Sequence, residues 1–161
     1  MTSKNQARYE FYMREALREA QIAYDLGEVP IGAVCVYDDQ IISHAHNVRE
    51  LLKDPAGHAE FIALEAASLK QDRWRLSGLE VFVTLEPCVM CAGLMVNARI
   101  ERCVFGAKDP KGGALETLYK LGEDKRLNHG FEVVSGVLED ECSELLRRFF
   151  KELRHKNKRP R

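Results

Sequence analysis

The stretch LEVFVTLEPCVMCAG, residues 79–93, joins two features that together decide the fold. Its first half is a short apolar run of the kind that forms a buried strand. Pro87 then stands directly before Cys88, and Cys91 follows three residues later. Because proline is favoured at the start of a helix, the stretch predicts a strand that runs into a short helix, with both cysteines in its first turn.

Predicted strands and helices alternate along the chain on both sides of this stretch. Residues 30–47 contain two apolar runs joined by two aspartates, which predicts a β-hairpin, and residues 58–71 are rich in the helix-forming Ala, Leu and Glu. Further strands are predicted at residues 100–107 and 131–137, and a final helix is predicted to begin with Asp140 as its cap. This alternation predicts an α/β sandwich with an at least partly parallel sheet.

Length and composition indicate a globular protein. The chain has 161 residues, of which 45% are hydrophobic and 30% are charged, and we expect a single domain over residues 1–161. No apolar run reaches the roughly 18 residues that a membrane span needs, and the charged N-terminus lacks a signal-peptide core. Five cysteines without a disulfide-framework spacing fit a reducing compartment. We therefore expect a cytoplasmic protein with no membrane partner.

Charge is unevenly distributed along the chain. Residues 147–161 hold eight Lys and Arg and one acidic residue, net +7, whereas the rest holds 16 basic and 24 acidic residues, net −8. A basic C-terminal helix and tail, from about residue 140, predicts a polyanionic partner. A solvated tail that serves only solubility is the alternative.

His58 and Cys88 begin successive predicted helices, with one helix and one strand between them. Right-handed crossover connections bring such helix starts together beyond the carboxyl ends of the strands. His58, Cys88 and Cys91 then supply three zinc ligands, and a catalytic zinc site keeps its fourth position for water. Glu60 lies two residues beyond His58 and could act on that water as a general base.

These motifs resemble the zinc-dependent cytidine deaminase superfamily and, within it, the bacterial tRNA adenosine deaminase family. The resemblance covers nearly the whole chain, through GEVPIGAV (27–34), DPAGHAE (54–60), TLEPCVMCAG (84–93) and VFGAKDPKGG (104–113). It implies a three-layer α-β-α sandwich around a central, largely mixed/parallel five-stranded sheet.

The resemblance also implies a function, the hydrolytic deamination of adenosine to inosine at the wobble position of a tRNA anticodon. One Zn²⁺ per subunit would be bound by His58, Cys88 and Cys91, and Glu60 would shuttle protons to the base and the departing amine. The implied partners are the tRNA anticodon stem-loop and a second copy of the chain in a homodimer. The expected substrate-binding residues are Asn47, Val29, Pro30, Asp109, Lys111, Arg148 and Phe149.

Phe149 and Phe150 are adjacent in the sequence, so one of them must point away from the core that the other joins. An outward aromatic ring beside Arg147 and Arg148 would offer a stacking platform for a splayed base. We assign Arg148 and Phe149 to this role. A second buried face of the helix is the alternative.

Two other functions fit the same motifs. A deaminase of free cytosine, cytidine or guanine would use the same zinc chemistry, although a basic C-terminal end serves no purpose there. A non-catalytic RNA-binding module with a structural zinc would need a fourth protein ligand, from Cys103, Cys142 or a histidine. That alternative leaves Glu60 without a role.

Overall fold

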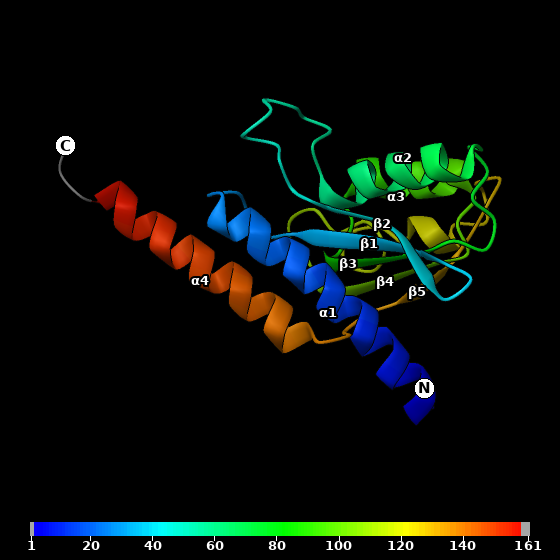
Figure 1. Cartoon of the computed structure of the whole chain (residues 1–161), viewed down its shortest axis with the longest axis horizontal. Helices are drawn as coiled ribbons and strands as arrows, with labels where there is room; N and C mark the ends of the chain where they lie inside the picture. The colour runs from blue at the N-terminus through cyan, green and yellow to red at the C-terminus, as the bar shows by residue number, and fades with distance from the viewer. Residues whose placement is uncertain (1, 159–161) are drawn as a thin grey trace.

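A computed structural model describes residues 2–158 and contains a five-stranded sheet between two layers of helices. Helices α1 and α4 cover one face of the sheet, and α2 and α3 cover the other (Figure 1). The three-layer α-β-α sandwich is thereby confirmed. In chain order the elements are α1 (Ser3–Asp25), β1 (Gly32–Tyr37), β2 (Gln40–His46), α2 (Ala59–Gln71), β3 (Glu80–Leu85), α3 (Val89–Ala98), β4 (Arg102–Ala107), the short 3-10 helix η1 (Leu121–Glu123), β5 (Glu132–Val134) and α4 (Glu139–Lys158).

The sheet is mixed, with the strand order β2-β1-β3-β4-β5. Strand β1 pairs antiparallel with β2 and with β3, whereas β4 pairs parallel with β3 and with β5. The β1–β2 hairpin turns at Asp38 and Asp39, whose φ angles are 51° and 57°. Positive φ at both central residues is what a two-residue hairpin turn of type I′ requires, and aspartate tolerates this conformation, so the paired aspartates explain the turn.

Two hydrophobic cores lie on opposite faces of the sheet. Because successive side chains of a strand point to opposite faces, β3 contributes to both cores. Val81 and Val83 join the core against α2 and α3, together with Leu64 and Met95. Phe82 joins the core against α1, where aromatic rings of that helix surround it. The continuous apolar run of β3 is therefore explained by burial on both sides.

The predicted boundaries of the last strand and the last helix are wrong. Helix α4 begins at Glu139, so Asp140 lies in the first turn instead of at the cap. Strand β5 is shorter than predicted, because the chain leaves the sheet before Gly136, whose φ of 80° interrupts the extended backbone. None of the helices within residues 2–158 is long and apolar enough to cross a membrane.

Candidate metal centre and active site

His58 and Cys88 occupy the same position in two neighbouring helices. Each is an N-cap residue with extended backbone, φ −89° and ψ 146° for His58 and φ −77° and ψ 177° for Cys88. Helices α2 and α3 therefore begin at Ala59 and Val89, one residue later than predicted. Neither side chain caps its own helix, so both can face the space between the two helix starts.

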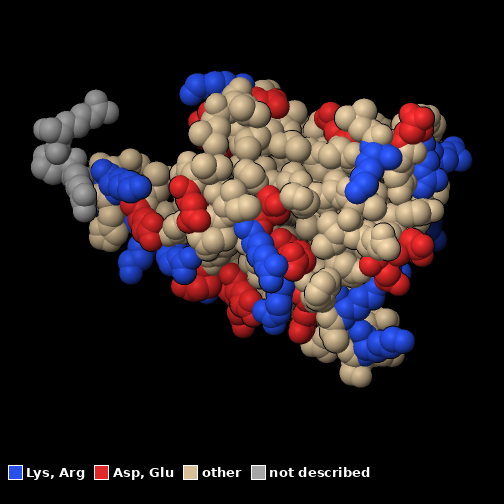
Figure 2. Space-filling view, viewed as in Figure 1, with Lys and Arg blue, Asp and Glu red and all other residues tan. Residues whose placement is uncertain are grey.

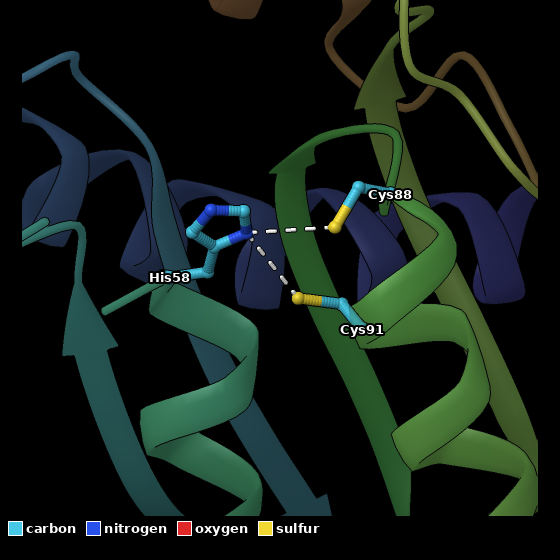
Figure 3. Close-up of side chains that lie close together, drawn as sticks. All are labelled: His58, Cys88 and Cys91. Carbon is cyan, nitrogen blue, oxygen red and sulfur yellow. Dashed lines mark hydrogen bonds between the residues drawn. The ribbon is translucent and has the colours of Figure 1, made fainter. Parts of the chain in front are cut away.

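The imidazole of His58 lies against both cysteines (Figure 3). Its Nδ1 atom is 3.5 Å from Sγ of Cys88 and 3.5 Å from Sγ of Cys91. The ligand atoms of the three residues all lie within 4.8 Å of one another. One nitrogen and two sulfurs at this spacing suit three corners of a tetrahedral site. The helix starts meet as the crossover argument predicts, and the group could hold a metal ion.

Protons are unevenly shared within this group. The hydrogen bond with Cys91 lowers the pKa of Cys88 to about 4, and the contact with His58 acts in the same direction. The same sulfur–sulfur contact raises the pKa of Cys91, and the contact with Cys88 raises the pKa of His58. Cys88 therefore loses its proton first, and the thiolate is the form of cysteine that binds metal.

Glu60 lies in the first turn of α2, with only 4% of its surface exposed. Burial disfavours the charged carboxylate and raises the pKa of Glu60 to about 7. A carboxyl group that titrates near neutral pH can both accept and donate a proton. The environment of Glu60 therefore suits acid–base chemistry.

A cavity of about 240 Å³ opens beside His58, Glu60 and Cys88. Its other walls come from loops, strand ends and helix α4: Val29, Ile31, Asn47, Arg49, Leu85, Glu86, Asp109 and Phe150. A larger hollow of about 870 Å³ lies elsewhere, around Arg99 and Gly130. It is not lined by any member of the His–Cys group, as we call His58, Cys88 and Cys91. The smaller cavity is therefore the candidate site, because it alone of the two meets the potential ligands.

Asn47 presents a fixed amide to this cavity. It is 5% exposed; its Nδ2 donates to the Val29 carbonyl at 3.2 Å, and its Oδ1 accepts from the Arg49 N–H at 3.1 Å. An amide has two donor hydrogens and two acceptor positions. Each end of the Asn47 side chain therefore retains one position for a further hydrogen bond.

The cysteines considered as a fourth ligand lie elsewhere. Cys103 is buried in the core against α2 and α3, and Cys142 is buried in the core on the opposite face of the sheet. Across residues 2–158, the group of potential ligands consists of His58, Cys88 and Cys91 alone. A set of three protein donors is typical of catalytic zinc sites, whereas structural sites use four.

Comparison with known proteins gives the family. The profile of the MafB19-like deaminase family matches residues 8–154. The tRNA-specific adenosine deaminase of Bacillus subtilis (strain 168) is 52% identical over 152 residues, 94% of either chain. A solved structure from a study of A-to-I editing by tRNA:A34 deaminases at the wobble position of transfer RNA matches with a TM-score of 0.81 and 41% identity, over 84% of this chain and 99% of that chain. This chain belongs to the tRNA adenosine deaminase family.

A solved structure of a deaminase that acts on a different substrate has a similar fold but lower sequence identity. The guanine deaminase of Nitrosomonas europaea matches with a TM-score of 0.73 but only 25% identity, over 87% of this chain and 83% of that chain. The resemblance to bacterial tRNA adenosine deaminases is confirmed.

Four of the seven expected substrate-binding residues of this tRNA adenosine deaminase family member do not line the cavity. Pro30 is buried, and Lys111 lines an adjoining groove. The Arg148 guanidinium lies over the ring of Tyr24, 5.1 Å from its centroid, on the α1 side of α4. Phe149 is 8% exposed and packs edge-on against the same ring. The prediction for Phe149 is wrong because a buried ring cannot stack on a substrate base, and Arg148 faces away from the cavity.

Five wall residues were not among the predicted site residues: Ile31, Arg49, Leu85, Glu86 and Phe150. Phe150 is 40% exposed and takes the outward position that we assigned to Phe149. Glu86 carried a usable signal, since an acidic residue directly after a buried apolar strand needs a partner. Arg49 carried none, because one arginine in a charged loop is normally only solvated.

Proposed function

We propose that this protein binds one zinc ion per subunit and hydrolyses adenosine to inosine at the wobble position of a tRNA anticodon. The observation that carries the proposal is the shared cavity, whose walls include Glu60, Asn47 and two members of the His–Cys group, His58 and Cys88. At about 240 Å³ it lies below the roughly 300–1,000 Å³ of pockets for drug-sized ligands. One extruded base could enter it while the rest of the RNA stays outside.

The residues of the chain divide the chemistry among them. His58, Cys88 and Cys91 would hold the zinc ion, which when bound supplies an activated water molecule at neutral pH. Glu60 would carry both protons of the consumed water in turn at its carboxylate oxygen, one to the ring nitrogen and one to the departing amine. The C6–N bond breaks, a C6–O bond forms, and ammonia leaves. Asn47 would orient the base through the two open positions of its amide.

A basic groove beside the cavity favours RNA over a free base. It has a volume of about 840 Å³ and shares Val29, Leu85, Asp109 and Phe150 with the cavity. Its cationic walls are Lys108 and Lys111 from one loop and Arg147, Lys151 and Arg154 from α4.

The α4 cations of the groove recur at the spacing of a single helix face, and basic side chains are visible near the C-terminal end of α4 (Figure 2). Phosphates of nucleotides flanking the target base would neutralise them. Phe150, which belongs to both cavity and groove, would stack on a neighbouring base.

We also propose a homodimer in the cytoplasm, with the single deaminase domain spanning residues 1–161. Several apolar side chains are exposed on the α2–α3 layer and on the loop before α2. Figure 1 shows that this loop projects from the rest of the chain. The exposed side chains include Leu52, Leu69 and Val89, which are 67%, 83% and 52% exposed. A second copy would cover such a surface. All five cysteines are free thiols, which fits a reducing compartment. Light scattering after size-exclusion chromatography should give the mass of two chains.

One assay tests the reaction. The protein is incubated with anticodon stem-loops that carry A or C at the first anticodon position, and with free adenosine, cytidine and guanine. Inosine should form only in the A-bearing stem-loop. Turnover of a free base or nucleoside at a comparable kcat/KM would instead identify a small-molecule deaminase. Stem-loop binding without turnover would indicate the non-catalytic module.

A further inference from the structure

We infer that Glu86 is a positioning residue that holds the substrate-side loop, residues 108–117, in place; this inference rests on the proposed function. Glu86 follows the last residue of β3 and is 2% exposed. Its own N–H donates to the Ala107 carbonyl at 2.8 Å, which ties the end of β3 to the end of β4. The carboxylate therefore projects from hydrogen-bonded backbone at the carboxyl end of the central strand.

The Glu86 carboxylate accepts five hydrogen bonds, all of them from the substrate-side loop. Oε1 accepts from the Asp109 N–H at 3.2 Å and from the Thr117 hydroxyl. Oε2 accepts from the N–H groups of Leu115, Glu116 and Thr117 at 3.2, 2.9 and 3.0 Å. Hydrogen bonds to a charged acceptor are about twice as strong as neutral ones. One side chain thus gathers both ends of a loop that contains no helix or strand.

Because the loop is held by Glu86, the loop residues that line the candidate site are held in place as well. Asp109 lines both the cavity and the groove, and Lys108 and Lys111 line the groove. The Asp109 side chain is fixed in turn, since its Oδ1 accepts from the N–H groups of Lys111 and Gly112 at 3.0 and 3.2 Å. The placement of Asp109 and of the two lysines therefore depends on Glu86.

Gly113 shows how closely the loop wraps the carboxylate. A Cβ atom at this position would overlap the carboxyl group of Glu86. The Gly113 N–H donates to the Asp109 carbonyl at 3.0 Å, and this hydrogen bond holds the turn around the anchor. Gly113→Ala should therefore push the loop off Glu86 while leaving the carboxylate chemically intact.

The competing account is that Glu86 only stabilises the fold or the metal site. Such a role is the alternative because Glu86 is buried and lies two residues before Cys88. The two accounts differ in what changes. A positioning role predicts a loosened loop and weaker RNA binding in a folded, metal-loaded protein. A purely structural role predicts loss of metal or of stability, with no effect confined to the loop.

The experiment compares the full-length protein with Glu86→Gln, Gly113→Ala and the control Glu123→Gln, which changes an exposed carboxylate beyond the loop. Amide hydrogen exchange without substrate should accelerate within residues 109–117 in the first two variants only. Zinc content should stay at the wild-type value. With the anticodon stem-loop, KM should rise by roughly 10- to 100-fold, the scale on which misplacement reduces catalysis, while kcat changes less than about three-fold.

Unchanged exchange within residues 109–117, or faster exchange spread evenly over the chain, would overturn the inference. Loss of zinc in both variants would overturn it as well. Because exchange and metal content are measured without substrate, they remain informative if the RNA proves not to be the substrate. A loosened loop with no stem-loop turnover by the wild type would reject the proposed function and leave the anchoring role of Glu86 intact.

Discussion

Phe149 and Phe150 lie edge to face, with ring centroids 5.5 Å apart, yet they have different environments on α4. Phe149 is buried against Tyr24 of α1, whereas Phe150 lines the cavity that contains His58 and Glu60. Two adjacent and identical side chains thus have separate roles, one in the packing of α4 on α1 and one at the candidate RNA surface.

Alanine substitution should separate these two roles. Phe149→Ala should destabilise the fold by about 3 kcal/mol, as core Phe→Ala changes do, and should lower the midpoint of urea unfolding. Phe150→Ala should leave that midpoint nearly unchanged and weaken stem-loop binding by about 1–3 kcal/mol, the contribution of one stacked base. Equal loss of stability in both variants would contradict the different burial of the two rings.

The salt dependence of RNA binding should report which cations meet phosphate. Lys151→Gln and Arg154→Gln remove cations from the groove, so each should reduce the slope of log K against log salt by about one. Arg148→Gln is the matched control, because its guanidinium covers Tyr24 instead. Fluorescence anisotropy with a labelled stem-loop over a salt series gives the slopes. A larger change in Arg148→Gln than in the groove variants would refute this path for the RNA.

Removing the proton carrier should separate metal binding from turnover. Glu60→Gln keeps the size of the side chain but cannot exchange protons, so kcat should fall by about 10²–10⁴-fold. Zinc measured by plasma emission should remain at one ion per chain. Glu65→Gln, an exposed position on the same helix, should keep wild-type kcat. Full activity of Glu60→Gln would favour the non-catalytic alternative.

Metal removal should destabilise the protein, since a ligand that binds only the folded state stabilises it by mass action. Treatment with a chelator should lower the melting temperature, and zinc should restore it. Cys91→Ala removes one of the three donors, so its melting temperature should be insensitive to both treatments. A chelator effect that persists undiminished in Cys91→Ala would place the metal elsewhere.

Two glycine substitutions should test the packing of α1 on the sheet. A Cβ atom at Gly32 would overlap the backbone of Ala16 and Ala20 in α1, whereas a Cβ atom at Gly93 meets nothing within 4 Å. Gly32→Ala should therefore lower the free energy of unfolding by about 1–3 kcal/mol through overpacking. Gly93→Ala, inside α3, should raise it by about 0.4–1 kcal/mol. Thermal unfolding of both variants measures the difference.

Much of the candidate site could be predicted because its strongest signals are local. The spacing of Cys88 and Cys91 fixes them on one helix start, and the interval from His58 contains one helix and one strand. Right-handed crossovers then leave little freedom in where the two helix starts meet. The cavity walls from Arg49, Glu86 and Phe150 were not predictable in this way, because each depends on how a loop or helix packs on the sheet.

The amino-acid sequence alone predicts the α/β alternation, the hairpin turn at Asp38 and Asp39, and the His–Cys group. Periodicity, turn chemistry and ligand spacing all act over short distances along the chain. Only the tertiary structure decided which phenylalanine of α4 faces the cavity and which loop the Glu86 carboxylate holds. The rotation of a helix about its axis and the partner of a buried charge are set by contacts between segments far apart in the chain, here α4 with α1 and the end of β3 with residues 109–117.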